Sequence, residues 1–478
     1  MITCKLPSLW VSLIPVLLLI GLLSYCVTVF GDSMLSGPSQ IVLLVATGVV
    51  VMIAMVFYGK TWNELETSMV NGIGRTMPAN LILLMVGGLS GTWMHSGIIP
   101  TMIYYGLDVI SPCWMLLTSC VLCSLVSIII GSSWTTIATI GIGLMGIGRT
   151  LSLDECWIAG AIISGAYFGD KMSPLSETTN LASGVSDVPL FTHIRNMLYT
   201  TVPSLLITLS IFFFVGLTGG GVTQYIAQDS AMKMQQQLSE TFLVSPWLLL
   251  VPVAVFYLIY KGLSATIVLF LGMLVGAIFV VAQQGFDFSM ECSFGEVGYT
   301  TGYDAVDSLT CTRGMGGMLY TIWLIICSMC FGGVMECSGM LECITHHLMR
   351  IMKNRFSTVL TTCLSCIFLN CATADQCLAI ILPSKMYGAA YRKLKLPNKL
   401  LSRTLEDSGT VTSVLVPWNS CGMTQSTVLG VATMAYAPYA FFCWISPLMT
   451  VIAACFQKTS SQPDKEEEPL QTENSMQS

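Results

Sequence analysis

Charge is what this chain has least of. Asp, Glu, Lys and Arg make up 10% of its 478 residues, against roughly 25% in ordinary soluble domains. This scarcity excludes a water-soluble globular protein. The sequence also has no zinc-ligand motif, phosphate-binding loop or nucleophile elbow, and Ser132 and Ser133 have no evident histidine base nearby. We therefore expect neither an enzyme nor a nucleic-acid-binding protein.

Hydrophobic residues make up 54% of the chain and are gathered in long runs. A helix that crosses a hydrocarbon core of about 30 Å needs about 20 apolar residues. We expect spans near 9–29, 41–58, 81–94, 114–130, 197–217, 247–260, 266–281, 319–335, 359–368 with its continuation, and 441–455. The sequence thus predicts an all-α polytopic membrane protein. Most of the nineteen cysteines lie in these runs, where they act as small apolar residues.

The two halves of the chain resemble each other, as they do in many transporters. An ungapped offset of 242 residues pairs the segment from Gly87 with the segment from Met329, and it pairs the polar break 131–135 with 373–377. We expect a first repeat at 1–218, a linker loop at 219–242, a second repeat at 243–456 and a disordered acidic tail at 457–478.

Loop charges favour an inverted relation between the repeats. Residues 60–75, taken as a loop, balance basic and acidic side chains, whereas the corresponding stretch of the second half is acidic. Residues 104–111 are weakly acidic, whereas 346–355 are rich in His, Lys and Arg. By the positive-inside rule, we predict two inverted-topology repeats with broken helices and re-entrant hairpins, and both termini in the cytoplasm. The basic cluster from Arg392 to Arg403 would then fall outside, which this topology does not explain.

Polar residues interrupt the apolar runs at four places. Residues 169–180 and 406–426 are rich in carboxylate, hydroxyl and amide side chains, and two shorter breaks lie at 132–136 and 373–376. A charged side chain at mid-membrane costs about 2.5–3.5 kcal/mol even on the lenient scale, so such residues line cavities or pair. Oxygen ligands of these kinds suit a hard cation such as Na⁺. We expect Asp170, Asp375 and Asp407 to bind Na⁺ and protons in competition, with Ser132, Ser133, Thr135 and Thr373 from the shorter breaks.

Structural alternatives exist for these residues. Asp170 could pair with its neighbour Lys171 at the membrane edge, and Ser or Thr in a span often only joins helices. Glu406 could be a charge at a helix end. A channel is a further alternative, because polar breaks also build selectivity filters, but repeat inversion and titratable sites favour alternating access.

Four motifs together carry a family resemblance: GSSWTT, GAYFGDKMSPLSETTNLA, TADQ and EDSGTVTSVLVPWNSCG. With them the chain resembles the NhaC Na⁺/H⁺ antiporter family of the ion-transporter superfamily, over most of its length. The resemblance implies inverted repeats with a scaffold and a mobile part, and sodium coupling at opposed hairpins. The site residues that it implies are Asp170, Ser173, Glu177, Thr178, Asn180, Asp375, Asp407, Thr410 and Asn419.

The resemblance implies exchange of Na⁺ for H⁺ across the cell inner (cytoplasmic) membrane, with no cofactor. The family also includes members that resemble malate/lactate antiporters and amino-acid exchangers, so a small organic anion or an amino acid stays open as a further substrate. A homodimer also stays open, because the sequence does not fix the oligomeric state.

Overall fold

A computed structural model describes residues 7–30, 37–218, 224–295, 303, 306 and 312–456 of the chain. Within these residues, eight helices are long and apolar enough to cross a membrane, or up to ten if two sharply bent helix pairs each count as one span. The prediction of an all-α polytopic membrane protein with broken helices is confirmed.

Every predicted span forms a helix. These helices are α1 (Leu9–Phe30), α2 (Pro38–Tyr58), α3 (Trp62–His95), α5 (Met115–Ile130), α10 (Leu190–Leu217), α12 (Leu250–Tyr260), α13 (Ala265–Gln284), α16 (Leu319–Cys337), α18 (Arg355–Thr373) and α24 (Phe441–Phe456). The polar breaks lie among shorter helices: α6 (Ser133–Thr136), η3 (Ile137–Gly141), α7 (Ile142–Thr150), α8 (Glu155–Met172), α9 (Glu177–Val185), α19 (Gln376–Lys393), α20 (Asn398–Leu405), η6 (Glu406–Thr410), α21 (Val411–Ser413) and α22 (Ser420–Leu429). The remaining longer pieces are α4 (Ile98–Val109), α11 (Gln224–Thr241), α14 (Phe286–Phe294) and α17 (Met340–Met349).

Two stretches taken as loops are helical. Residues 60–75 were expected to form a loop, but α3 begins at Trp62, because Thr61 and Glu64 form a reciprocal capping box that stabilises a helix start. The expected linker 219–242 contains α11. The expected acidic tail 457–478 lies outside the described residues.

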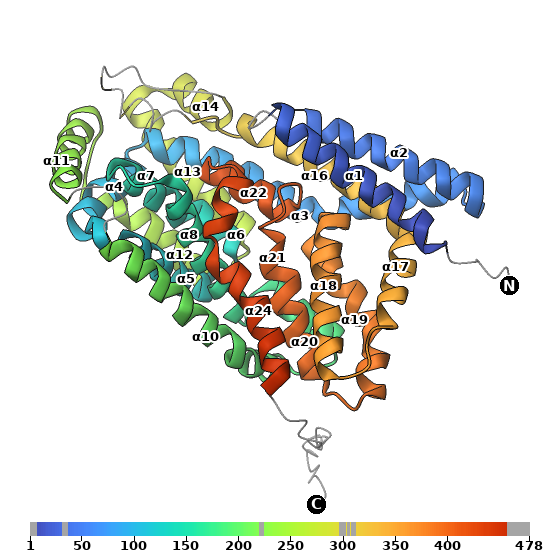
Figure 1. The fold of residues 1–478 in the computed structure, drawn as a ribbon. Helices are drawn as coiled ribbons and strands as arrows, with labels where there is room; N and C mark the ends of the chain where they lie inside the picture. The colour runs from blue at the N-terminus through green and yellow to red at the C-terminus, as the bar shows by residue number, and fades with distance from the viewer. Residues whose placement is uncertain are drawn as a thin grey trace, which may run out of the picture.

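The long helices α1, α2, α16 and α3 run side by side along one flank, while α10, α24, α20 and α18 slant across the other part of the molecule (Figure 1). Small residues allow α3 and α16 to approach closely. A Cβ on Gly72 would lie 2.9 Å from the carbonyl oxygen of Met329, and the Ser68 hydroxyl donates to the carbonyl oxygen of Gly333 at 2.8 Å. Packing through small residues and interhelical hydrogen bonds is typical of membrane helices.

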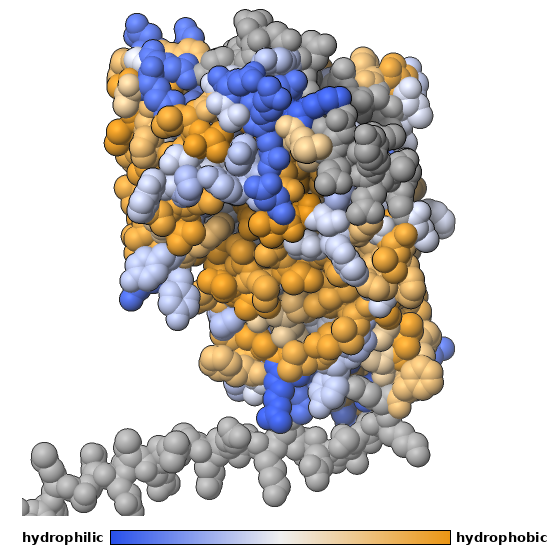
Figure 2. All heavy atoms as spheres, turned by 90° about the vertical axis from the view of Figure 1, so that its left-hand side faces the viewer, coloured by the Kyte–Doolittle hydropathy of each residue, from blue (hydrophilic) through white to orange (hydrophobic). Residues whose placement is uncertain are grey.

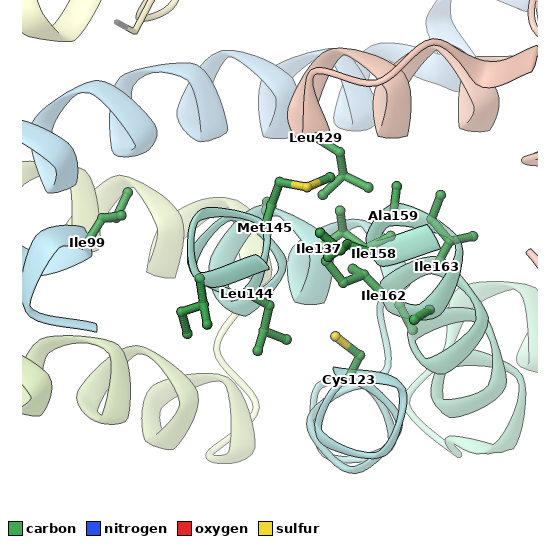
Figure 3. Close-up of a cluster of buried hydrophobic side chains, with 14 of the residues drawn as sticks. Ile99, Cys123, Ile137, Leu144, Met145, Ile158, Ala159, Ile162, Ile163 and Leu429 are labelled. Carbon is green, nitrogen blue, oxygen red and sulfur yellow. The ribbon is translucent and has the colours of Figure 1, made fainter. Parts of the chain in front are cut away.

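Apolar side chains of α5, η3, α7 and α8 fill the space beside the broken helices. Figure 3 shows Ile137, Ile158, Ile162 and Ile163 gathered above Cys123. Met145 and Leu429 lie on the side of these isoleucines that faces away from Cys123. On the outer surface, an apolar band crosses the face drawn in Figure 2 between hydrophilic residues above and below it. The molecule therefore has both a packed interior for its short helices and a lipid-facing belt.

Equivalent points of the two halves share local geometry. Gly97 and Gly339, which are 242 residues apart, both have left-handed backbone conformations, with φ of 84° and 74°, between two helices. Gly131 and Ala374 are also left-handed, with φ of 75° and 55°. Each is followed by a side chain that caps the next helix, Ser132 or Asp375. The equivalence at this second point is therefore shifted by one residue from the ungapped offset. The inversion of the repeats stays a prediction.

Candidate functional site

Four helix breaks lie near the centre of the molecule, among α6, α8, α21 and α22 (Figure 1). Each break is followed by a helix whose first turn is capped by a side chain. The capping residues are Ser132 for α6, Ser176 for α9, Asp375 for α19 and Asn419 for α22. Side-chain oxygens satisfy N–H groups that a helix start leaves unpaired, so the chain can break inside an apolar bundle.

The breaks pack in pairs, one pair in each half. In the first half, a Cβ on Gly131 would lie 2.6 Å from the Cβ of Leu175 and 3.0 Å from the amide nitrogen of Ser176. In the second half, the Ser420 amide donates to the carbonyl oxygen of Ala374 at 3.0 Å. Each half therefore brings its two helix breaks into direct contact.

Asn370 connects the second pair. Its side-chain nitrogen donates to the Gly409 carbonyl oxygen at 2.7 Å and to the Thr412 hydroxyl at 3.0 Å. The backbone carbonyl oxygen of Asn370 accepts a hydrogen bond from the Asn419 side chain at 3.1 Å. Asn419, which was predicted as an ion ligand, is thus occupied in holding α18 to the start of α22.

Asp170 lies at the first pair of breaks. It is almost fully buried, and its Oδ2 accepts hydrogen bonds from the Ser133 amide at 3.1 Å and from the Ser133 hydroxyl at 2.7 Å. The carboxyl group therefore meets the amino-terminal end of α6, where the helix dipole favours negative charge. Predicted residues Asp170 and Ser133 are in direct contact.

Glu406 reaches the same place from the second half. Its side chain is fully buried in η6, and its Oε1 accepts from the Thr178 hydroxyl at 3.0 Å. The Glu406 carboxyl interacts electrostatically with Asp170 and lies beside the Thr410 side chain. We call Ser133, Asp170, Thr178, Glu406 and Thr410 the carboxylate site. It joins both halves of the chain.

Asp407 faces a different group of residues. It is fully buried and forms an ion pair with Lys171, and its Oδ2 accepts from the hydroxyls of Thr200 (2.8 Å) and Thr450. Lys171 also donates to the Ser446 hydroxyl at 2.8 Å. The alternative in which Lys171 pairs with Asp170 is wrong, because Lys171 reaches Asp407, 236 residues further along the chain.

The other predicted site residues have the following places. Ser132, Thr135, Ser173 and Thr373 hydrogen-bond within their own turns. Asn180 donates to the carbonyl oxygens of Pro174 and Ser176 and so closes the second break. Asp375 is buried and caps α19 through the amides of Cys377 (2.6 Å) and Leu378 (3.1 Å). Glu177 is exposed and interacts electrostatically with Asp170 and Asp375.

Sequence reasoning did not select Glu406 for the carboxylate site, or Lys171 as the partner of Asp407. An ionisable residue inside a membrane bundle is functional by default, and that argument could have found both. The hydroxyl partners Thr200, Ser446 and Thr450 had no such signal, because single hydroxyl residues are common in membrane helices. Only the packing of α10 and α24 against α8 and η6 brings them to the ion pair.

Within the described residues, no group of three or more His, Cys, Asp or Glu side chains is arranged to hold a metal ion. The carboxylate site instead offers two carboxyl groups and several hydroxyls. Buried carboxylates at broken helices and a buried ion pair that joins two halves of a membrane bundle define an ion-coupled secondary transporter.

Comparison with known proteins gives the family. The model of the Na⁺/H⁺ antiporter family matches residues 165–457. The chain is 38% identical to the Na⁺/H⁺ antiporter NhaC of Alkalihalophilus pseudofirmus, over 82% of this chain and 84% of that protein. It is 35% identical to NhaC of Bacillus subtilis, over 85% and 90% of the two chains. It is 34% identical to the malate-2H⁺/Na⁺-lactate antiporter of Bacillus subtilis, over 87% and 88%. The chain belongs to the Na⁺/H⁺ antiporter family.

Proposed function

We propose that this protein exchanges Na⁺ for H⁺ by alternating access, and that Na⁺ and protons compete for the carboxylate site. The observation that carries the proposal is that two buried carboxyl groups from different halves meet at the same break: Asp170 accepts from Ser133, and Glu406 accepts from Thr178, in the helix that follows the break after Asp170. Two carboxylates buried in one region repel each other unless a cation or a proton neutralises them. Exchange of one for the other is antiport.

The ligand chemistry of the carboxylate site suits Na⁺. Its polar atoms are carboxylate and hydroxyl oxygens, which hard cations prefer. The Ser133 and Thr178 hydroxyls each donate a hydrogen bond to a carboxyl oxygen. Thr178 also accepts from the Ser176 hydroxyl at 3.1 Å, so each of the two hydroxyl oxygens keeps at least one lone pair for a cation. Thr410 adds a third hydroxyl next to Glu406.

The ion pair couples the carboxylate site to the surrounding helices. Asp170 and Lys171 are neighbours in α8, and Glu406 and Asp407 are neighbours in η6. Asp170 and Glu406 belong to the carboxylate site, and the residues that follow them, Lys171 and Asp407, form the ion pair. We infer that α8 and η6 move together when the site changes its occupant, because a separation of the two segments would expose a buried charge.

Purified protein in proteoliposomes with an internal pH-sensitive dye tests this function. An inward Na⁺ gradient should raise the internal pH, because H⁺ leaves as Na⁺ enters, and an outward Na⁺ gradient should lower it. An equal K⁺ gradient should leave the internal pH unchanged. Lowering the pH should raise the apparent KM for Na⁺, by up to about tenfold per pH unit if one proton competes. No pH change under any tested buffer would contradict the proposal.

A second candidate is Na⁺- and H⁺-coupled exchange of a small organic anion. The similarity to the malate-2H⁺/Na⁺-lactate antiporter, at 34% identity over most of both chains, favours it. The same proteoliposomes would then respond only when malate, lactate or an amino acid is present on at least one side. Full transport with Na⁺ alone would argue against this candidate.

We also propose that the protein lies in the cytoplasmic membrane with both termini in the cytoplasm. Exposed basic residues lie in and around the connection between α19 and α20: Arg392, Lys393 and Lys395. This connection is at the same end of the molecule as the end of α24 (Figure 1). The topology expected from the sequence would place these basic residues outside the cell. They lie at the same end of the molecule as the end of α24, and the positive-inside rule supports a cytoplasmic position for that end.

A further inference from the structure

Arg75 and Glu336 form a partly exposed ion pair between two apolar helices. The Nη1 atom of Arg75 lies 3.0 Å from the Oε2 atom of Glu336, and the two side chains are 43% and 33% exposed. Arg75 belongs to α3 and Glu336 to α16, and both helices are long and apolar enough to cross a membrane. An exposed ion pair adds little to stability, and charges inside a membrane bundle face a water-filled space or the path of an ion. Stability alone therefore does not explain this pair.

The pair lies beside the helix break that carries Asp375. One turn before Glu336, a Cβ on Gly332 would lie 3.1 Å from the carbonyl oxygen of Thr373, and residues four apart lie on the same face of a helix. Asp375 follows Thr373 by two residues, and both hydrogen bonds by which it caps α19 end on its Oδ1. Its Oδ2 is left for another partner, and Arg75 and Glu336 both act on this carboxyl group electrostatically. Arg75 thus lies near two carboxyl groups, of which it binds that of Glu336.

The molecular surface reaches the carboxylate site at this place. Glu177, the first residue of α9, is exposed, and the next residue, Thr178, is the hydrogen-bond donor to Glu406. Gln376, which follows Asp375 and begins α19, is partly exposed. Helices α9 and α19 pack against each other, and Glu177 interacts electrostatically with Asp375. A cation can therefore reach the carboxylate site between the starts of α9 and α19, past Asp375.

We propose that Arg75 and Glu336 form a charge gate at the entrance for Na⁺ between the starts of α9 and α19. While Glu336 holds Arg75, Asp375 keeps its negative charge for a passing cation. If Arg75 leaves Glu336 for Asp375, its guanidinium group binds that carboxylate with paired hydrogen bonds and repels Na⁺ from the entrance. The change of partner costs little, because the pair with Glu336 is exposed to solvent. The gate rests on the proposed exchange of Na⁺ for H⁺, and it gives both residues a positioning role outside the carboxylate site.

Initial rates of the Na⁺-driven pH change in proteoliposomes test the gate. Glu336→Gln releases Arg75, so the KM for Na⁺ should rise about threefold or more while kcat changes little. In the double variant that adds Arg75→Gln, the released cation is gone, and the KM should return to that of the unaltered protein. High ionic strength, set with choline chloride, should reduce the effect of Glu336→Gln, because the entrance is exposed to solvent. A merely structural role would instead lower Tm and kcat in the double variant at least as much as in the single one.

Glu155→Gln is the matched control. Glu155 forms an ion pair with Arg149 at 2.8 Å, and the side chains of Glu155 and Arg149 are 46% and 36% exposed. This variant removes the same charge from a similar pair and should leave the KM for Na⁺ unchanged. The gate is overturned if Glu336→Gln has the KM of Glu155→Gln, or if the double variant keeps the raised KM of Glu336→Gln.

Labelling of Cys377 separates the gate from the exchange. Cys377 is partly exposed and lies two residues after Asp375. Its reaction with cationic and anionic methanethiosulfonate reagents is measured by peptide mass spectrometry on the purified protein in detergent, where no transport is needed. Glu336→Gln should lower the ratio of cationic to anionic labelling by about threefold or more, and the double variant should restore it. These ratios without a Na⁺-driven pH change would refute the exchange and keep the gate, whereas exchange with equal ratios in all three proteins would refute the gate alone.

Discussion

At the scale of single residues, Asp170 and Lys171 are neighbours in the sequence but belong to different groups: Asp170 to the carboxylate site and Lys171 to the ion pair with Asp407. Successive residues of a helix point about 100° apart, so Asp170 faces Ser133 while Lys171 faces Asp407. The cost of burying charge made Asp170 predictable from the sequence. The partner of Lys171 was not predictable, because adjacency suggested Asp170 and nothing in the sequence reports a contact across 236 residues.

Replacement of Asp170 with Asn should remove the charge and keep the shape. We expect the Na⁺-driven pH change to fall by about tenfold or more, since a charged ligand of the cation and the proton is lost. The measurement is the initial rate of dye response in proteoliposomes. Asp187→Asn makes the same chemical change at an exposed residue with φ of 53°, a conformation that Asn adopts readily, and it should retain full activity. Equal rates for both variants would remove Asp170 from the site.

The Lys171–Asp407 pair predicts non-additive effects on stability. Lys171→Met leaves Asp407 buried without its cation, and Asp407→Asn leaves Lys171 buried without its anion, so each should lower the unfolding free energy by about 3–5 kcal/mol. The double variant should lose less than the sum, because both charges are gone and Asn can still accept from Thr200 and Thr450. Denaturant unfolding of the four proteins in detergent measures this. Strict additivity would mean that the pair contributes no coupling.

At the scale of helices, composition predicted that the apolar runs are broken but not how the breaks are held together. Gly, Pro, Ser and Asn marked three of the four segments in the sequence, and a lone aspartate between apolar runs marked the fourth, at 373–376. The packing of Gly131 on Leu175 and the bridge from Asn370 to Asn419 depend on tertiary contacts. For the same reason, Asp375 and Asn419 were predicted as ion ligands, whereas the structure gives both a helix-capping contact.

Gly131→Ala tests the importance of the first break. Alanine in a left-handed conformation costs about 1–2 kcal/mol, and at Gly131 its Cβ would also lie 2.6 Å from the Cβ of Leu175. Gly59 is the control, because its φ is 62° and a Cβ there meets nothing within 4 Å. We expect Gly131→Ala to lower the Tm more than Gly59→Ala and to raise the KM for Na⁺, because the break positions Ser133 against Asp170. Equal effects on Tm and an unchanged KM would show that the close packing is dispensable.

At the scale of the whole molecule, equivalent loops of the two halves lie near opposite ends of α10. The loop before α5 packs against the carboxyl-terminal end of α10, where Cys113 meets Gly216. The loop before α18 is followed by Arg355, which interacts with Arg403 of α20. Helix α20 is joined to the amino-terminal part of α10, where the His193 ring hydrogen-bonds to Ser402 at 2.7 Å. A helix of 28 residues is about 42 Å long, so this arrangement supports inverted repeats.

Epitope insertion tests both the inversion and the orientation. A short tag is inserted after Ile110 in one protein and after Met352 in another, in the loops that precede α5 and α18. If the repeats are inverted and the basic side is cytoplasmic, antibody should bind the tag after Met352 in inside-out vesicles and the tag after Ile110 in right-side-out vesicles. A third tag, after Asp187 in the loop before α10, should behave like the tag after Met352. Only variants that retain the Na⁺-driven pH change are compared, since a misinserted chain would report a false topology. If the tags after Ile110 and Met352 bind antibody in the same kind of vesicle, inversion is excluded. If each of the three tags binds in the vesicles opposite to those expected, the repeats are inverted and the orientation in the membrane is the reverse of the one proposed.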